Sequence, residues 1–447
     1  MTFLDGLLAG RSHVAFLLGL AAAAATAAAV RRIAPEPRAA SLETLAPAAE
    51  DLAPRPHGPL DARERALASV AWSYLRRNTD PATGLAASVE GHPATTMWDL
   101  GSQLLGVLAA EDLGLVSRAG ASERLARALR SLSAIPLCDG LPNKVYDTRT
   151  LEMVRYDGTP APRGIGWSAL DVARVLLPLS VVAVRHPELA PAVRRAVSRW
   201  RLEALTDGGA LRGATRRPDG GLDVWQEGRL GYEQHAAKSL LAWGLTAAGA
   251  LDYRRHVAFT RVDGQLVPRD DRRPADHGGH RAPLVAEPWL LDAVERGPDA
   301  VTLPVLRALL RAQERRAAAV GRLTAASEDA LDRAPWFAYS AIVEGDASFT
   351  ALGPDLAPAP GALTFSTKAA VVWGVLFEGP YPERLLAAAA ELAVPGRGLL
   401  AGRYDATWEP NRALSLNTNA VALEALAYRV RGPLGRVAPA PPPEEAR

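Results

Sequence analysis

The 447-residue chain has little sulfur chemistry and no dominant charge. Its single cysteine, Cys138, excludes an internal disulfide framework and any cysteine-based zinc site. The chain carries 51 basic and 49 acidic residues, a net charge of +2. Its basic residues, nearly all arginine, are scattered among glutamate and aspartate, and no basic stripe marks a surface for nucleic acid. We therefore expect no nucleic-acid partner.

Signature motifs of several enzyme classes are also missing. The sequence has no glycine-rich phosphate loop after a strand, no GxSxG elbow, no HExxH motif and no Asp-rich signature of a terpene cyclase. The two clusters with metal-ligand chemistry are Asp270-Asp271 and the DHGGH run at 276–280. They stand in an arginine-rich loop with paired glycines, a composition typical of solvated surface. We expect neither a metal nor a cofactor.

The N-terminal segment predicts where in the cell the protein is located. Residues 14–30 (VAFLLGLAAAAATAAAV) form an uncharged run of about the length that crosses a bilayer. Its small-residue tract suits signal cleavage, whereas Arg31 and Arg32 favour a cytoplasmic C-terminal side. We interpret residues 1–32 as a signal or anchor segment that places the protein in the periplasm, tethered to the inner membrane. The alternative is a domain at the cytoplasmic face.

Two further segments lack hydrophobic periodicity and limit the domain. Residues 33–59 are rich in alanine, proline and charge and predict a linker, and residues 433–447 predict a disordered proline-rich tail. Between them, residues 60–432 predict one domain made of helix after helix. The expected helices are roughly 61–77, 97–113, 121–134, 167–186, 189–205, 231–250, 284–296, 299–318, 327–345, 366–378, 382–393 and 416–431.

These helices are of two kinds. Some have a charged face and suit an outer layer, while others begin with a polar or aromatic cluster and continue as small apolar residues. Alternation of the two kinds predicts an all-α fold, an (α/α)6 toroid in which the clusters of the inner helices line one mouth. A solenoid of helical hairpins is the competing architecture, but no fixed repeat is visible.

The motifs resemble those of the bacterial DUF3131 family from about Leu60 to Tyr428. They are TTMWD at 95–99, LPNKVY at 141–146, PRGIGWSALD at 162–171, QEGRLGYE at 226–233, AEPW at 286–289, STKAA at 366–370 and NTNA at 417–420. The resemblance implies a fold similar to glucoamylase-like (α/α)6 glycoside hydrolases and an association with polysaccharide systems of the bacterial envelope. The family's function is undefined, so the resemblance transfers no catalytic residue.

Glycoside hydrolysis needs two carboxyl groups, one protonated and one ionised. Glu233 begins a buried helix beside Tyr232, so we expect burial to raise its pKa and make it the general acid. Asp99, which follows Trp98, is the predicted second carboxylate, and Glu287 and Glu328 are further candidates. Each of these carboxylates is equally suited to neutralising a helix N-terminus.

Two other carboxylates receive structural interpretations. We expect Asp171 to be an internal partner of Arg174 or Arg163, and Glu227 to form an ion pair with Arg229. Glu227 and Arg229 remain candidates for substrate binding.

Aromatic and polar side chains at the predicted mouth suit an oligosaccharide or polysaccharide. Rings stack on the apolar face of a pyranose and amide or cationic groups bond its hydroxyls, although a single ring on an apolar helix is more often core. The remaining substrate-binding candidates are Trp98, Asn143, Lys144, Tyr146, Arg163, Trp167, Tyr232, Trp289, Trp336, Lys368, Asn417 and Asn419.

Three functions remain open on these residues. The first is a glycoside hydrolase or transglycosylase acting on a glucan or exopolysaccharide. The second is a non-catalytic glycan-binding or scaffold component of the exopolysaccharide machinery. The third, a sugar epimerase or unsaturated-glycan hydrolase, would need His235 for proton transfer.

Overall fold

In the computed structural model, the described part of the chain comprises residue 45 and residues 52–252, 254, 256–273 and 281–435. The predicted signal or anchor segment at 1–32, most of the linker and most of the C-terminal tail lie outside it. So does the DHGGH run. Within the described part no helix is long and apolar enough to cross a membrane, and no group of His, Cys, Asp and Glu is placed to hold a metal.

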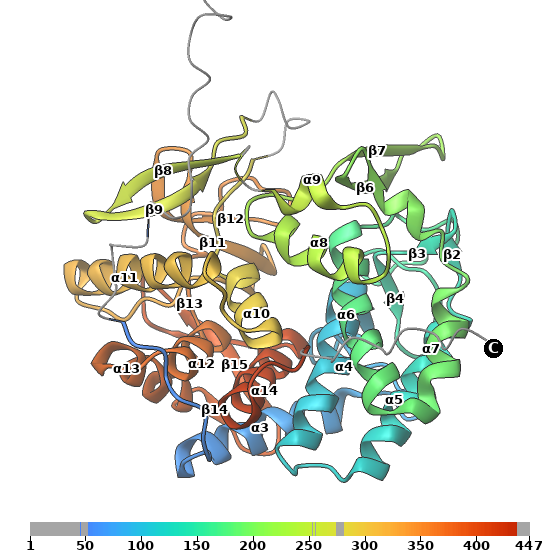
Figure 1. Cartoon of the computed structure of the whole chain (residues 1–447), viewed down its shortest axis with the longest axis horizontal. Coiled ribbons are helices and arrows are strands. Elements are labelled where there is room, and N and C mark those ends of the chain that lie inside the picture. Colours follow the sequence, from blue (N-terminus) through green and yellow to red (C-terminus); the bar gives the residue numbers. More distant parts are fainter. Residues whose placement is uncertain (1–44, 46–51, 253, 255, 274–280, 436–447) are drawn as a thin grey trace, which may run out of the picture. The chain divides into compact units, whose positions relative to one another are not determined.

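Six helices form a closed inner ring. They are α4 (Met97–Asp112), α6 (Ala169–Arg185), α8 (Tyr232–Ala242), α10 (Glu287–Arg296), α12 (Thr367–Leu376) and α14 (Leu416–Arg431). Each packs on the next, and α14 packs on α4. In Figure 1 the red C-terminal helix accordingly lies beside the blue N-terminal segments.

An outer helix covers each inner one. The outer set is α3 (Ala62–Asn78), α5 (Arg118–Ala134), α7 (Ala190–Val197), α9 (Ala248–Leu251), α11 (Thr302–Val320) and α13 (Pro380–Ala390). These pack on α14, α4, α6, α8, α10 and α12 respectively. The arrangement of the described helices is the predicted (α/α)6 toroid.

The sequence explains the two layers. Every residue of α12 is buried, and a Cβ at Gly101 of α4 would lie 2.6 Å from the carbonyl oxygen of Arg174, so the inner helices approach at backbone distance. The outer helix α3 is amphipathic and starts with a capping box, in which Asp61 and Glu64 each accept the other's backbone N–H at 2.8 Å. Burial of apolar faces and ordinary capping therefore build the ring.

The prediction of an all-α fold is wrong, because antiparallel sheets gather where the inner helices begin. The strands are β1 (Ala94–Thr96) with β4 (Val145–Asp147); β2 (Leu137–Cys138) with β3 (Leu141–Pro142); β5 (Thr206–Asp207), β6 (Ala210–Arg216) and β7 (Leu222–Gln226); β8 (Val257–Val262) with β9 (Gln265–Asp270); β10 (Glu328–Ala330), β11 (Phe337–Glu344) and β12 (Ala347–Leu352); and β13 (Thr364–Ser366), β15 (Gly398–Tyr404), β14 (Ala393–Val394) and β16 (Pro410–Leu414). They occupy most of the long loops that the sequence left without structure.

Two helix predictions also change. The segment 327–345 forms β10 and β11 because its aromatic and β-branched residues pair as strands across a turn that contains Pro335. The segment 231–250 divides into α8 and α9 at Gly244, which has a φ of +79°.

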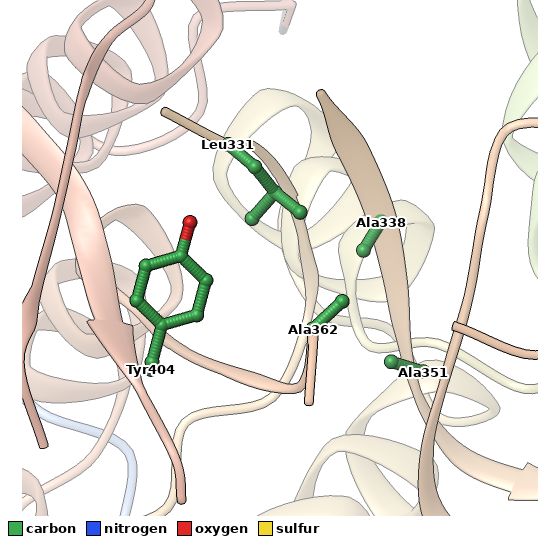
Figure 2. Close-up of a cluster of buried hydrophobic side chains, with 5 residues drawn as sticks. All are labelled: Leu331, Ala338, Ala351, Ala362 and Tyr404. Atoms are coloured by element: carbon green, nitrogen blue, oxygen red, sulfur yellow. The ribbon is translucent and has the colours of Figure 1, made fainter. Parts of the chain in front are cut away.

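A small apolar cluster fixes the β10–β12 sheet to β15. Leu331, Ala338, Ala351, Ala362 and Tyr404 are buried together (Figure 2). The Tyr404 hydroxyl donates to Asp332 at 2.6 Å, which ties the turn after β10 to the neighbouring sheet. The β10–β11 hairpin is therefore held firmly at its turn.

The chain joins this packed domain before the predicted start at residue 60. Leu52 is buried, the N–H of Arg55 donates to the carbonyl of Leu376 at 2.9 Å, and Arg55 pairs with Glu64 at 2.7 Å. The end of the predicted linker is thus part of the outer surface of the ring.

Candidate active site

Acidic and aromatic side chains meet where α4, α6 and α8 begin and where β7, β10 and β11 approach them. We call this group the mouth cluster: Asp99, Asp171, Glu227, Arg229, Glu328 and Tyr339. Its members influence one another electrostatically, since Asp171 interacts with Glu227 and Asp99, and Tyr339 with Arg229, Glu328 and Asp171. The cluster combines four carboxyl groups, one guanidinium and one tyrosine from distant parts of the chain.

Asp171 lies in the first turn of α6 and is partly exposed. Its backbone N–H donates to the Ser168 hydroxyl at 3.1 Å, which is the N-cap of the helix. Burial, followed by the negative charge of Glu227, raises the pKa of Asp171 to about 7. Neither of its predicted partners pairs with it: Arg163 donates to the carbonyl of Gly220, and Arg174 is buried among other acids.

Arg174 forms ion pairs with Glu295 and, at 3.1 Å, with Glu424, and all three side chains are fully buried. The expectation that Arg174 neutralises Asp171 is therefore wrong. The charge of Arg174 is neutralised by these two glutamates inside the ring. Asp171 is left as a carboxyl with no ion pair to any described cation, which suits a group that carries a proton at neutral pH.

Glu227 directly follows β7 and lies across the start of α6. Its Oε2 accepts the N–H groups of Ala169 at 2.6 Å and Leu170 at 3.3 Å. A Cβ at Gly213 would lie 2.8 Å from the carboxyl carbon, so only glycine leaves room for it there. Burial raises the pKa of Glu227, while the charge of Lys144 and the hydrogen bonds at the helix start lower it. These donors favour the ionised form of Glu227 over that of Asp171.

Arg229 does not pair with Glu227 as predicted. Its guanidinium lies between two rings, 4.5 Å from the centroid of Tyr232 and 4.7 Å from that of Tyr339. The turn through Gly228 (φ +107°) directs Glu227 to α6 and Arg229 to the tyrosines. Stacking replaces the ion pair, and the arginine remains partly exposed at the mouth.

Glu328 and Tyr232 lie beside Arg229. The Tyr232 hydroxyl donates to Glu328, and burial together with the charge of Glu287 raises the pKa of Glu328 to about 7. Glu287 itself is saturated: it accepts from Lys368 at 2.7 Å, Asn417 at 2.9 Å and Ser327 at 2.7 Å. Glu287 and Lys368 thus form a buried pair that neutralises itself.

Asp99 is the N3 residue of α4, and its carboxylate is bound by hydroxyls. Thr96 donates to it at 2.7 Å, and Ser88 donates as well. Burial raises its pKa, which those two hydrogen bonds oppose. Trp98 lies next to it, with Arg174 5.5 Å from its ring centroid and Tyr232 6.0 Å away.

Glu233 is bound elsewhere. It pairs with Arg272 at 2.9 Å and accepts from Gln226, and Arg272 also pairs with Asp270. Burial raises the pKa of Glu233 to about 7, which Arg272 opposes. Its ion-pair partner Arg272 follows β9, and Asp270 is the last residue of that strand.

Several predicted binding residues are structural. Asn143 is fully buried and bridges Ile165 and Val145, Tyr146 donates to the carbonyl of Pro136, and Asn419 bonds to Ser415 and Leu399. Trp167 and Trp289 are core residues, 5% and 2% exposed. Lys144 is at the mouth, with its Nζ 5.2 Å from the ring centroid of Trp225.

The sequence did not indicate Tyr339 as a member of the mouth cluster, and it predicted the wrong partners for Asp171. Asp171 stood in a quoted motif, but its environment depends on Glu227, which is remote in sequence. His235, the candidate for epimerase chemistry, is buried and bonds to Glu295 at 2.8 Å. Burial lowers the pKa of His235 well below its usual value.

Comparisons with known proteins agree with this architecture. A family model described as "Protein of unknown function (DUF3131)" matches residues 66–432. The fold is similar to an endo-β-1,2-glucanase from Chitinophaga pinensis in complex with sophorotriose and glucose, at 12% identity over 84% of this chain and 94% of that one, with a TM-score of 0.57.

Two further solved structures share the fold. An endo-β-1,2-glucanase from Talaromyces funiculosus with sophorose is 12% identical over 83% of this chain and 84% of that one, with a TM-score of 0.51. A cellobiose 2-epimerase from Bacillus thermoamylovorans is 12% identical over 83% of this chain and 100% of that one, with a TM-score of 0.52. No curated protein sequence matches significantly.

Proposed function

The chain belongs to the DUF3131 family, and we propose that it is a carbohydrate-active enzyme, a glycoside hydrolase or transglycosylase that cleaves a glucan or exopolysaccharide. The observation that carries the proposal is the pair formed by Asp171 and Glu227. Both interact with the Ser168 hydroxyl at the start of α6, and neither has an ion pair with a described cation. Two nearby acids with different hydrogen bonding divide into one protonated and one ionised group.

Asp171 serves as the general acid in this mechanism. Its proton passes to the glycosidic oxygen while the bond between that oxygen and the anomeric carbon breaks. The negative charge of Glu227 stabilises the positive charge that develops on the sugar. A water molecule, or a sugar hydroxyl in transfer, then bonds to the anomeric carbon and returns a proton to the Asp171 carboxylate, which restores the acid.

Asp99 is the second candidate for the ionised partner. It is partly exposed, and only hydroxyl donors hold it. Glu233 is a weaker candidate for the acid because Arg272 occupies its carboxylate. Asp171→Asn, Glu227→Gln, Asp99→Asn and Glu233→Gln together distinguish these assignments.

Release of reducing sugar by the purified full-length protein tests the function. The panel contains β-1,2-glucan, β-1,3-glucan, α-1,4-glucan and bacterial exopolysaccharides. We expect product from at least one polymer and its loss in Asp171→Asn. Equal binding of a polymer by both proteins, without product, would refute the enzymatic function and favour the glycan-binding scaffold. The ion pairs that neutralise Glu233 and Glu287 also favour the scaffold.

We also propose that residues 1–32 hold the domain in the periplasm at the inner membrane, within reach of the exopolysaccharide machinery. The apolar run at 14–30 supports this. A C-terminal alkaline phosphatase fusion should be active in intact cells. An inactive fusion that accumulates normally would place the domain at the cytoplasmic face.

A further inference from the structure

Two aromatic side chains stand out among the described residues because they are exposed. Tyr156 is 63% exposed and Trp336 is 66% exposed, whereas most other rings are buried. Each is carried by a short turn on the side of the ring where the inner helices begin. Single exposed rings are common on protein surfaces. The position of these two rings relative to the mouth cluster is what distinguishes them.

Tyr156 comes two residues after Val154, which packs with Ala94 and Ile165 shortly before α4 and α6 begin. The negative charges of Asp171 and Glu227, and the hydroxyl of Tyr339, all act on its phenol. The ring is thus open to solvent while it remains next to the mouth cluster.

The turn that carries Tyr156 is well defined. The N–H of Arg155 donates to the carbonyl of Thr159 at 2.8 Å, and the N–H of Gly158 donates back to the carbonyl of Arg155 at 3.0 Å. Asp157 accepts from the hydroxyl of Thr159 at 2.7 Å, and Gly158 takes the positive φ (+83°) that closes the turn. Tyr156 is therefore held in place by its backbone.

Trp336 ends a row of rings on the β10–β11 hairpin. Tyr339 pairs with Glu328 across the hairpin, and Phe337 pairs with Ala330 at its end. Phe337 and Tyr339 lie on the same face of β11, with ring centroids 5.0 Å apart. Trp336 directly precedes Phe337, in the turn before β11, where it has a φ of +69°. The row leads outward from the mouth cluster.

The turn at the end of this row is anchored too. The N–H of Leu331 donates to the carbonyl of Trp336 at 2.8 Å, and the N–H of Trp336 donates to the carbonyl of Arg333 at 2.9 Å. Arg333 lies 3.6 Å from the ring centroid of Tyr404, and Leu331 and Tyr404 belong to the buried cluster of Figure 2. The turn that carries the exposed Trp336 is therefore held in place by buried residues.

We propose that Tyr156 and the row Tyr339, Phe337 and Trp336 form a stacking track for an extended polysaccharide chain, so that the site takes polymers in preference to disaccharides. This rests on the proposed function, because the track leads to the proposed acid pair. Rings fixed by their backbones lose little conformational freedom when a sugar stacks on them.

Steady-state kinetics of Tyr156→Ala, Tyr156→Phe and Trp336→Ala test the track. On the polymer of the panel that gives product, we expect KM to rise roughly 3- to 10-fold for each alanine variant. On the shortest oligosaccharide that is cleaved, Trp336→Ala should match the wild type. Tyr156→Phe should retain the wild-type KM because it keeps the ring. Val184→Ala is the control, an exposed apolar residue (51%) near the far end of α6.

An unchanged KM for the polymer in both alanine variants would overturn the track while leaving the hydrolase intact. An equal loss on long and short substrates would overturn it as well. If the wild type releases no product, the proposed function fails, and retardation in gels cast with each polymer decides the track separately. Retardation that disappears in Trp336→Ala and Tyr156→Ala would support it, and a wild type that no polymer retards would refute it.

Discussion

Replacing Asp171 by asparagine should weaken catalysis and strengthen the fold, with a defined dependence on pH. The native pKa of Asp171 is about 7, because of burial and the charge of Glu227, against an ordinary value of 3.8. The native state therefore keeps its proton over a pH range in which the unfolded chain has released it. The contribution of Asp171 to the free energy of unfolding is fully present below pH 3.8 and is lost as the pH rises toward 7.

The size of this effect follows from the shift. Three units correspond to about 4 kcal/mol of unfolding free energy between pH 4 and pH 8. Asparagine has nearly the same shape and does not ionise, so the unfolding free energy of Asp171→Asn does not fall in this way as the pH rises. Its advantage over the wild type should therefore be small at pH 4 and about 4 kcal/mol larger at pH 8, measured by urea unfolding at both pH values.

The same variant should lose activity by roughly 100-fold or more, because the amide supplies no acidic proton. In the wild type the rate should fall as the pH rises through about 7. A stability difference that is the same at both pH values, together with retained activity, would refute the reasoning about Asp171. Loss of activity without the pH-dependent gain would mean that Asp171 ionises normally in the native state.

Three further variants separate the roles of the other charges. Glu227→Gln should also reduce turnover roughly 100-fold, because it removes the charge that stabilises the developing positive charge on the sugar, and a fully active variant would contradict its role. Glu233→Gln should keep kcat within about two-fold and, because the native pKa of Glu233 is raised to about 7, should gain unfolding free energy over the wild type as the pH rises from 4 to 8; a large fall in kcat would identify Glu233 as the acid. Arg174→Met should cost about 3–5 kcal/mol in urea unfolding because the fully buried Glu424 loses its ion pair, and an unchanged midpoint would contradict this.

Much of the ring could be predicted from the sequence. The inner helix α12 is apolar nearly all round and the outer helix α3 shows one apolar face, so hydrophobic pattern alone indicates two layers. The segment 327–345 was misassigned because its strands pair across a turn, and the strand period is hidden by alanines that suit either structure.

The site was less predictable, because its properties arise between segments. Sequence shows that Asp171 and Arg174 are one helical turn apart, which predicts a pair. It does not show that Glu295 and Glu424 reach Arg174 from α10 and α14. Likewise Glu227 and Arg229 are near neighbours in sequence, but a helix start and two tyrosines bind them separately. Local spacing could not rank these competing partners.

Closure of the ring by α14 has a consequence for how the protein is made. The last helix packs against α3 and α4, and its Asn417 bonds to Glu287 below the mouth cluster. A chain still on the ribosome therefore has an open ring with an exposed apolar edge until residue 431 has emerged. Contacts of such long sequence separation slow folding and prolong exposure to aggregation. Fragments that lack α14 should accordingly depend on chaperones or accumulate as insoluble protein.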